Sequence, residues 1–205
     1  MSPIKAVIFD MGGVILRNID REPRLRLARK LGKTVDELEE FVFASETSEL
    51  ATLGKIDVGT HWTKTCEVLG IPPEEMGEFI DEFWAGDRMD YELTAFLDGL
   101  RPGIRTALLS NAWSDVPARL YDLYPGALDV FDEVIFSAAV GMEKPCPEIY
   151  RLAIDRLGIK PEEAVFVDDM PQNVRGAEAV GLHGIRFLNP QQARQDVISL
   201  FQSVP

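Results

Sequence analysis

The apolar residues of this chain fall into short runs of strand length that are separated by helical patterns. Five runs rich in branched residues predict strands, at Ile4–Phe9, Ile104–Leu109, Glu133–Phe136, Ala164–Val167 and His183–Leu188. Apolar residues at helical spacing, each series followed by a glycine, predict helices over Pro147–Leu157 and Pro171–Val180. Such alternation is typical of right-handed crossovers between parallel strands. We therefore expect an α/β fold with a mainly parallel sheet.

Residues 16–88 interrupt this alternation. The interval from Leu16 to Arg88 shows no convincing strand, and its amphipathic stretches predict helices at Arg21–Leu31, Val35–Phe43, Val58–Leu69 and Pro73–Trp84. Thr34 and Glu37 have the spacing of a capping box before one of these helices. We expect residues 16–88 to form an all-helical domain that packs against a core domain of residues 1–15 and 89–205.

The composition of the chain limits the classes of partner and the kinds of site that we expect. The 205 residues include 34 acidic and 21 basic side chains, and the formal net charge is -13. This charge repels nucleic acid and anionic membranes, so we expect neither as a partner, and any phosphate site must be locally positive. No apolar run approaches the ~18 residues of a membrane span and the first residues do not resemble a signal peptide, so we expect a cytoplasmic protein. Cys66 and Cys146 are too isolated for a disulfide framework or a zinc site.

The first two strand ends carry polar residues that suit an anion. Ligands of an open parallel sheet bind beyond the carboxyl ends of its strands. Asp10 follows the first strand on the turn Met11-Gly12-Gly13, whose amides can approach an anion closely. Ser110 and Asn111 end the second strand and offer neutral donors to phosphate oxygens. Taken alone, each is also typical of a turn or of a cap before a helix such as Ser114–Tyr124.

The two later strand ends add charge of both signs. Lys144 lies between stiffening prolines just before a helix, where a held ammonium would offset a phosphate and a carboxylate, although a surface lysine is the alternative. Asp168 and Asp169 directly follow the fourth strand. Helix capping explains one of the two but hardly both. Together with Asp10 they form a set of hard oxygen ligands that suits Mg²⁺.

This order of residues resembles the ordered signatures of the haloacid dehalogenase superfamily, and the match spans nearly the whole chain. The segment Gly141–Tyr150, which contains Lys-Pro-x-Pro-x-Ile-Tyr, is its most specific part. Leu53–Ile56, followed by Trp62, is similar to a recurrent segment of members that carry a helical cap after the first signature. The resemblance implies a Rossmann-like three-layer sandwich with an inserted helical cap.

The resemblance also implies a role for each matching residue. Asp10 would be the nucleophile, and Ser110 and Asn111 would hold the phosphate. The Lys144 ammonium would offset the negative charge of the Asp10 carboxylate and of the phosphate. Mg²⁺ would be held by the main-chain carbonyl of Gly12 and by the carboxylates of three residues: Asp10, Asp168 and Asp169. Asp169 would be the principal acidic ligand. Asn173 stands where many members have another Asp, so it would orient the metal ligands.

Gly12 is the departure from the family pattern. Family phosphatases usually place an Asp at this position, as general acid to the leaving oxygen and then base to the attacking water. That assistance is worth roughly 10²–10⁴-fold in rate. A substitute would have to come from the helical segment, where the candidates are Asp20, Glu49, Asp57 and His61, with packing as the alternative role for His61.

These observations predict a Mg²⁺-dependent phosphatase that acts on a small phosphorylated metabolite through an aspartyl-phosphate on Asp10. One alternative is a phosphate- and metal-binding or regulatory protein with impaired turnover. Another is cleavage of a phosphonate or haloacid, although the pair Asp168-Asp169 disfavours dehalogenation. Substrate identity and oligomeric state stay open, as does whether Trp62, Trp84 and Trp113 line a cleft or pack.

Overall fold

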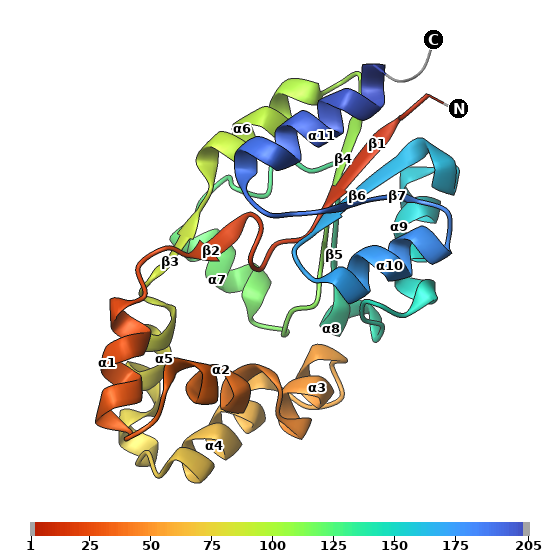
Figure 1. The fold of residues 1–205 in the computed structure, drawn as a ribbon. Coiled ribbons are helices and arrows are strands. Elements are labelled where there is room, and N and C mark those ends of the chain that lie inside the picture. Colours follow the sequence, from red (N-terminus) through yellow and green to blue (C-terminus); the bar gives the residue numbers. More distant parts are fainter. Residues whose placement is uncertain (1–2, 203–205) are drawn as a thin grey trace.

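A five-stranded parallel sheet forms the centre of the molecule. The computed structural model describes residues 3–202 (Figure 1). The sheet has the order β5-β4-β1-β6-β7, with all neighbours parallel. Its strands are β1 (Ala6–Phe9), β4 (Arg105–Ser110), β5 (Glu133–Phe136), β6 (Ala164–Asp168) and β7 (His183–Arg186). Each of the five predicted runs corresponds to one of these strands, although β4 and β6 end one residue later than predicted, and the predicted parallel sheet is confirmed.

Helices cover both faces of the sheet, because residues on its strands are buried on alternate sides. Val7 and Phe9 of β1 belong to one apolar cluster, whereas Ala6 and Ile8 belong to another. The first cluster packs under α6 (Tyr91–Leu100), α7 (Val116–Leu123) and α11 (Pro190–Gln202). The second packs under α9 (Pro147–Leu157) and α10 (Pro171–Ala179), while α8 (Ser137–Val140) and the short helix η2 (Pro161–Glu163) complete the connections. The predicted three-layer sandwich is confirmed.

A group of helices, here called the helical insertion, lies beyond the carboxyl ends of the strands (Figure 1). It consists of α1 (Glu22–Lys30), α2 (Val35–Phe43), α3 (Glu46–Thr52), α4 (Val58–Leu69), η1 (Pro73–Glu75) and α5 (Met76–Trp84). It has an apolar cluster of its own, which includes Leu38, Trp62 and Phe83. The predicted capping box is present: Glu37 N donates to Thr34 Oγ1 at 3.2 Å and Thr34 N donates to Glu37 Oε2 at 2.7 Å. Division into domains at residues 16 and 88 stays a prediction.

Two short strands, absent from the sequence prediction, join the insertion to the sheet. β2 (Leu16–Asn18) and β3 (Asp87–Met89) pair antiparallel. Arg17 forms an ion pair with Asp90, and Asn18 Nδ2 donates to Asp87 Oδ1 at 2.6 Å. The expectation of no strand between Leu16 and Arg88 was therefore wrong. Each strand has three residues, of which two are polar, which is too short to show a period-2 pattern. Pairing between the two ends of the insertion stabilises these strands instead.

A second connection, here called the α3–α8 contact, joins the opposite side of the insertion to the sheet. Ser137 Oγ, which is fully buried, donates to the carbonyl of Thr52 at the end of α3 at 2.7 Å. Gly54 has φ +65, and a Cβ at this position would lie 2.4 Å from the Ala138 carbonyl oxygen. Only glycine allows this approach of two backbones. The insertion is thus held over the strand ends from two sides.

None of the helices within residues 3–202 combines the length and the apolar character that crossing a membrane requires.

Candidate active site

Lys144 stands at the centre of a buried ionic cluster. Its Nζ lies 2.7 Å from Asp10 Oδ1 and 2.7 Å from Asp168 Oδ2. Asp10 directly follows β1, Asp168 ends β6, and Lys144 lies on the loop between α8 and α9. Asp10 N donates to the Val167 carbonyl at 2.9 Å, which fixes the start of the first loop against β6. The structure therefore brings together three residues that lie far apart in the sequence.

Asp168 is surrounded by donors. Its Oδ1 accepts from Met170 N at 2.8 Å, and its two oxygens lie 3.1 and 3.0 Å from Asn173 Nδ2. Lys144 binds Oδ2, so both carboxylate oxygens are engaged, and the residue is fully buried. Tyr150 Oη donates to the Asn173 carbonyl at 2.8 Å and ties α10 to α9. The Asn173 amide thus contacts both oxygens of Asp168, and its role in orienting metal ligands stays a prediction.

Asp169 completes a set of carboxylates that fits a divalent cation. One oxygen from each of Asp10, Asp168 and Asp169 lies within 4.8 Å of the others. Asp169 is only partly buried, and a Cβ at Gly13 (φ +77) would lie 2.5 Å from its Oδ2. Three carboxyl groups around one ammonium leave an excess of negative charge, and hard oxygen donors suit Mg²⁺. The residues present therefore fit the predicted metal.

The titration of the cluster reflects burial and crowding of like charge. Burial raises the pKa of Asp10 to about 7, with the Lys144 ammonium opposing this rise and the Asp168 carboxylate adding to it. Burial and the Asp168 carboxylate also raise the pKa of Asp169. Burial lowers the pKa of Lys144, but the charges of Asp10 and Asp168 outweigh it and hold that pKa above its usual value. Lys144 remains an ammonium, and the carboxyl groups favour an additional cation.

The loop after β4 is fixed to the lysine loop. Asn111 Nδ2 donates to the Lys144 carbonyl at 2.8 Å, and Lys144 N donates to Asn111 Oδ1 at 2.8 Å. The Asn111 side chain therefore holds the Lys144 backbone in place. Ser110, the last residue of β4, is buried at the same edge of the sheet. Phosphate binding by Ser110 and Asn111 stays a prediction.

Gly12 leaves its position in the site open. No atom of the described chain lies within 4 Å of the point where a Cβ at Gly12 would stand, apart from its chain neighbours. Three of the four candidate substitutes have other partners: Asp20 accepts from Glu22 N at 3.0 Å, Asp57 caps α4 by accepting from Thr60 N at 2.9 Å, and His61 is buried among aromatic rings. Glu49 is exposed on α3.

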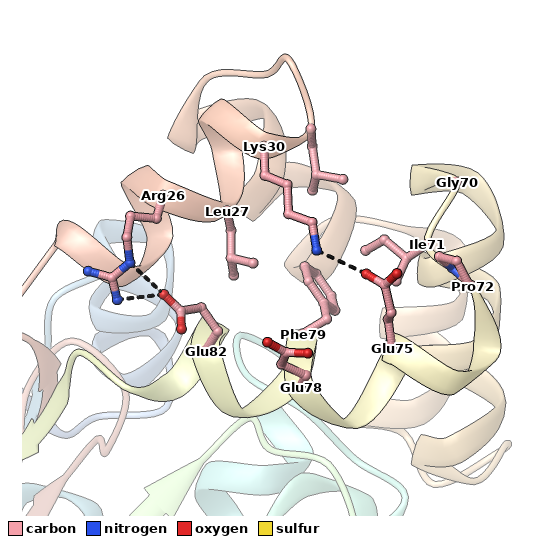
Figure 2. Close-up of a pocket in the computed structure, with 11 residues that line it drawn as sticks. Arg26, Leu27, Lys30, Gly70, Ile71, Pro72, Glu75, Glu78, Phe79 and Glu82 are labelled. Carbon is pink, nitrogen blue, oxygen red and sulfur yellow. Dashed lines mark hydrogen bonds and ion pairs between the residues drawn. The ribbon is translucent and has the colours of Figure 1, made fainter.

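One hollow lies within the insertion, away from the strand ends, and a smaller one lies between the insertion and α7. The larger hollow has a volume of about 360 Å³ and lies between α1 and α5, with Leu27 and Phe79 among its lining residues (Figure 2). Ion pairs cross it between Arg26 and Glu82 at 2.6 Å and between Lys30 and Glu75 at 2.9 Å. No predicted site residue lines it. Trp84 and Trp113 line the smaller hollow beside Met11, whereas Trp62 packs within the insertion.

Sequence reasoning missed three residues that support the site. Gly13 makes room for Asp169, Tyr150 fixes Asn173, and Ser137 accepts from Ala112 N at 2.9 Å on the loop that follows Ser110. Ser137 directly follows the strand β5, so the rule that identified Asp10 would also have found it. Gly13 and Tyr150 lie within quoted motifs, but their contacts require the fold.

A family model for haloacid dehalogenase-like hydrolases matches residues 4–181. The chain belongs to this family of hydrolases. It is 27% identical over 213 residues to D-ribitol-5-phosphate phosphatase from Bacteroides thetaiotaomicron, covering 98% of this chain and 100% of that protein. It is 29% identical over 187 residues to a sesquiterpene phosphatase from Aspergillus oryzae, covering 89% of each. A crystal structure of a family enzyme from B. thetaiotaomicron, an Asp-to-Ala variant in complex with magnesium and inorganic phosphate, is 25% identical with a TM-score of 0.71, covering 89% of this chain and 93% of that one.

Proposed function

We propose that this hydrolase is a Mg²⁺-dependent phosphatase that cleaves small phosphate monoesters with Asp10 as nucleophile. The observation that carries this proposal is the buried contact of Lys144 with both Asp10 and Asp168, next to Asp169. The two phosphatases named above and the magnesium and phosphate complex of the structural relative support it.

Asp10 attacks phosphorus, the ester oxygen leaves, and an aspartyl-phosphate forms that water then hydrolyses. Lys144 binds one carboxylate oxygen of Asp10, Oδ1, which leaves the other for attack. The Lys144 ammonium stabilises charge on the nucleophile and on the phosphate, and Ser110 donates to a phosphate oxygen.

Four groups would hold the cation: the carboxylates of Asp10, Asp169 and Asp168 and the main-chain carbonyl of Gly12. Bound Mg²⁺ would neutralise charge on the phosphate and the carboxylates. Asp169 is the principal ligand, because Asp168 already accepts from Lys144, Asn173 and Met170 N. Asn173 and Lys144 instead hold Asp168 at a fixed position beside the nucleophile.

Gly12 determines which esters react well. Without an acid at this position the departing oxygen receives no proton from the turn, so esters with acidic leaving groups are favoured. An acyl or aryl phosphate therefore tests the nucleophile without depending on the missing residue.

Removal of the nucleophile is the direct test. With acetyl phosphate and Mg²⁺, we expect Asp10→Asn to lower turnover by about 10⁴-fold or more, as removal of a covalent nucleophile does in other enzymes. Acid quenching should trap a phosphorylated wild-type chain and no phosphorylated variant. Asp155→Asn, an exposed change on α9, is the control and should retain activity. Equal turnover by Asp10→Asn would rule out this mechanism.

Removal of the principal metal ligand tests the cofactor. We expect Asp169→Asn to raise the Mg²⁺ concentration for half-maximal activity by at least about tenfold. The activity of wild type and variant is measured across a magnesium titration, with Asp155→Asn again as control. An unchanged magnesium requirement would show that Asp169 is not a ligand.

Binding without turnover is a second function, and the open position at Gly12 favours it. Isothermal titration with inorganic phosphate and Mg²⁺ would then show saturable binding, while no phosphate ester is hydrolysed. Turnover of acetyl phosphate that depends on Asp10 excludes this second function.

A further inference from the structure

A cavity of about 70 Å³ lies beside the loop that carries the nucleophile. Met11, the neighbour of Asp10, lines it together with Trp113 from the loop after β4. Trp84 lines it at the end of α5, and α7 contributes residues that include Val116 and Leu123. The loops that follow β1 and β4, directly after Phe9 and Ser110, thus also form part of the cavity wall. The cavity therefore begins one residue along the chain from the nucleophile, at Met11.

The cavity offers few partners to a polar ligand. Its wall is formed mainly by aliphatic and aromatic side chains. Among the polar residues that line it, Asp87 is engaged with Arg24 at 3.0 Å and with Asn18. Asp115 and Arg119 remain, and the buried Oδ1 of Asp115 has no hydrogen-bond partner in the described chain. These two side chains could bind only some of the hydroxyl groups of a polyol or sugar, and each of the others would be buried without a partner, at a cost in free energy.

We propose that this cavity receives the organic part of the substrate, and that the substrate is a phosphate monoester of a compact apolar alcohol. The inference rests on the proposed phosphatase activity and specifies its substrate class. The rings of Trp84 and Trp113 provide rigid apolar walls, because their centroids lie 6.2 Å apart in an edge-on arrangement within a larger aromatic cluster. Leu123, which is 60% exposed, marks the side on which the cavity meets solvent.

Three esters with the same kind of leaving group separate this inference from the effect of Gly12. We compare 3-methylbutyl phosphate, glycerol 1-phosphate and glucose 6-phosphate, which all release a primary alkoxide, with acetyl phosphate as the reference. The missing acid affects the three alkyl esters alike, so the ratio of their kcat/KM values reports recognition of the organic group. We expect kcat/KM for 3-methylbutyl phosphate to exceed the values for the other two by about 10- to 100-fold.

Substitutions at the cavity mouth test its location. Leu123→Trp should lower the ratio of kcat/KM for 3-methylbutyl phosphate to that for acetyl phosphate by about tenfold, because the larger ring fills the space. Leu123→Arg, which places a charge at the same point, should lower this ratio as well and serves if the first variant does not fold. Val68→Trp, at a 66% exposed position on α4 that does not line the cavity, should leave the ratio unchanged.

The outcomes separate this inference from the proposal on which it rests. If the enzyme turns over acetyl phosphate but uses glycerol 1-phosphate or glucose 6-phosphate as well as or better than 3-methylbutyl phosphate, the apolar substrate class is wrong. The proposed phosphatase activity is unaffected by that result. An unchanged ratio in both Leu123 variants overturns the assignment of the cavity. Absence of turnover for every phosphate, acetyl phosphate included, overturns the proposed function and the inference together.

Discussion

Lys144 at the strand ends and His61 in the helical insertion are both buried basic side chains, yet their surroundings differ. Lys144 lies 2.7 Å from each of two carboxylates. His61 has one polar side-chain contact, between Nδ1 and Thr47 Oγ1 at 2.9 Å, and its buried Nε2 has no partner within residues 3–202. The centroid of its ring lies 4.7 Å from the ring centroid of Trp113. Burial lowers the pKa of His61 to about 4, whereas the pKa of Lys144 stays above its usual value.

The difference shows that each region buries polar groups by a different means. At the strand ends, loops bring carboxylates and main-chain donors to one point, so a buried charge is compensated and can act on a substrate. In the insertion, the helices satisfy their own backbones and present aromatic rings, so a buried imidazole remains neutral. The first region is therefore suited to chemistry and the second to packing and to shaping the cavity beside Met11.

Removal of the compensated charge should have the largest effect. Lys144→Met leaves Asp10 and Asp168 facing each other without a counter-charge, and we expect it to lower the free energy of unfolding by about 3–5 kcal/mol and to abolish turnover. Urea unfolding measures the first quantity. Lys64→Met removes an exposed ammonium that pairs with Glu67 and should change stability by less than about 1 kcal/mol. A similar loss of stability in Lys144→Met and Lys64→Met would show that the buried ammonium contributes no more than the exposed one.

Protonation of His61 should have an intermediate effect. Its pKa is about 4 in the folded chain and about 6.5 when unfolded, so the unfolded state binds the proton first as the pH falls. The contribution of His61 to stability should be constant above pH ~6.5 and should fall by up to about 3 kcal/mol as the pH drops towards ~4. The measurement is urea unfolding across this range.

The chain has two histidines, which provides a matched control. His61→Leu should remove much of this pH dependence, while His183→Leu, at a partly buried position on β7, should retain it. Equal pH profiles for the two variants would show that His61 is not the responsible group.

Loss of the hydroxyl at the α3–α8 contact should have the smallest effect. Ser137→Ala leaves the Ala112 amide and the Thr52 carbonyl without this partner, which should cost about 1–2 kcal/mol. Because Ala112 follows Asn111, we also expect a lower kcat for acetyl phosphate. Ser114→Ala, an exposed change on the same loop, is the control for both measurements. An unaltered kcat in Ser137→Ala would separate this contact from the site.

The sequence predicted the parts of the site that depend on chain order. Parallel strands end at one edge, so Asp10 and Asp168 could be placed together from the strand pattern, whereas the role of Lys144, on the loop between α8 and α9, came from the family resemblance. The pairing of β2 with β3 could not be predicted, because it joins residues on either side of the whole insertion. The contact of Asn111 with the Lys144 backbone could not be predicted either, because it joins loops that follow different strands and depends on their spacing in three dimensions.

The two glycines after Met11 have unequal freedom to change. Position 13 requires glycine for two reasons: its φ is positive, and a side chain there would displace the carboxylate of Asp169. Gly12 has neither constraint, and a Cβ there would meet open space. A side chain could therefore be introduced at Gly12 without moving the carboxylates that we propose hold the metal, whereas a side chain at Gly13 would displace Asp169. If the proposed function holds, substitutions at these two adjacent positions would change catalytic rate and metal affinity separately.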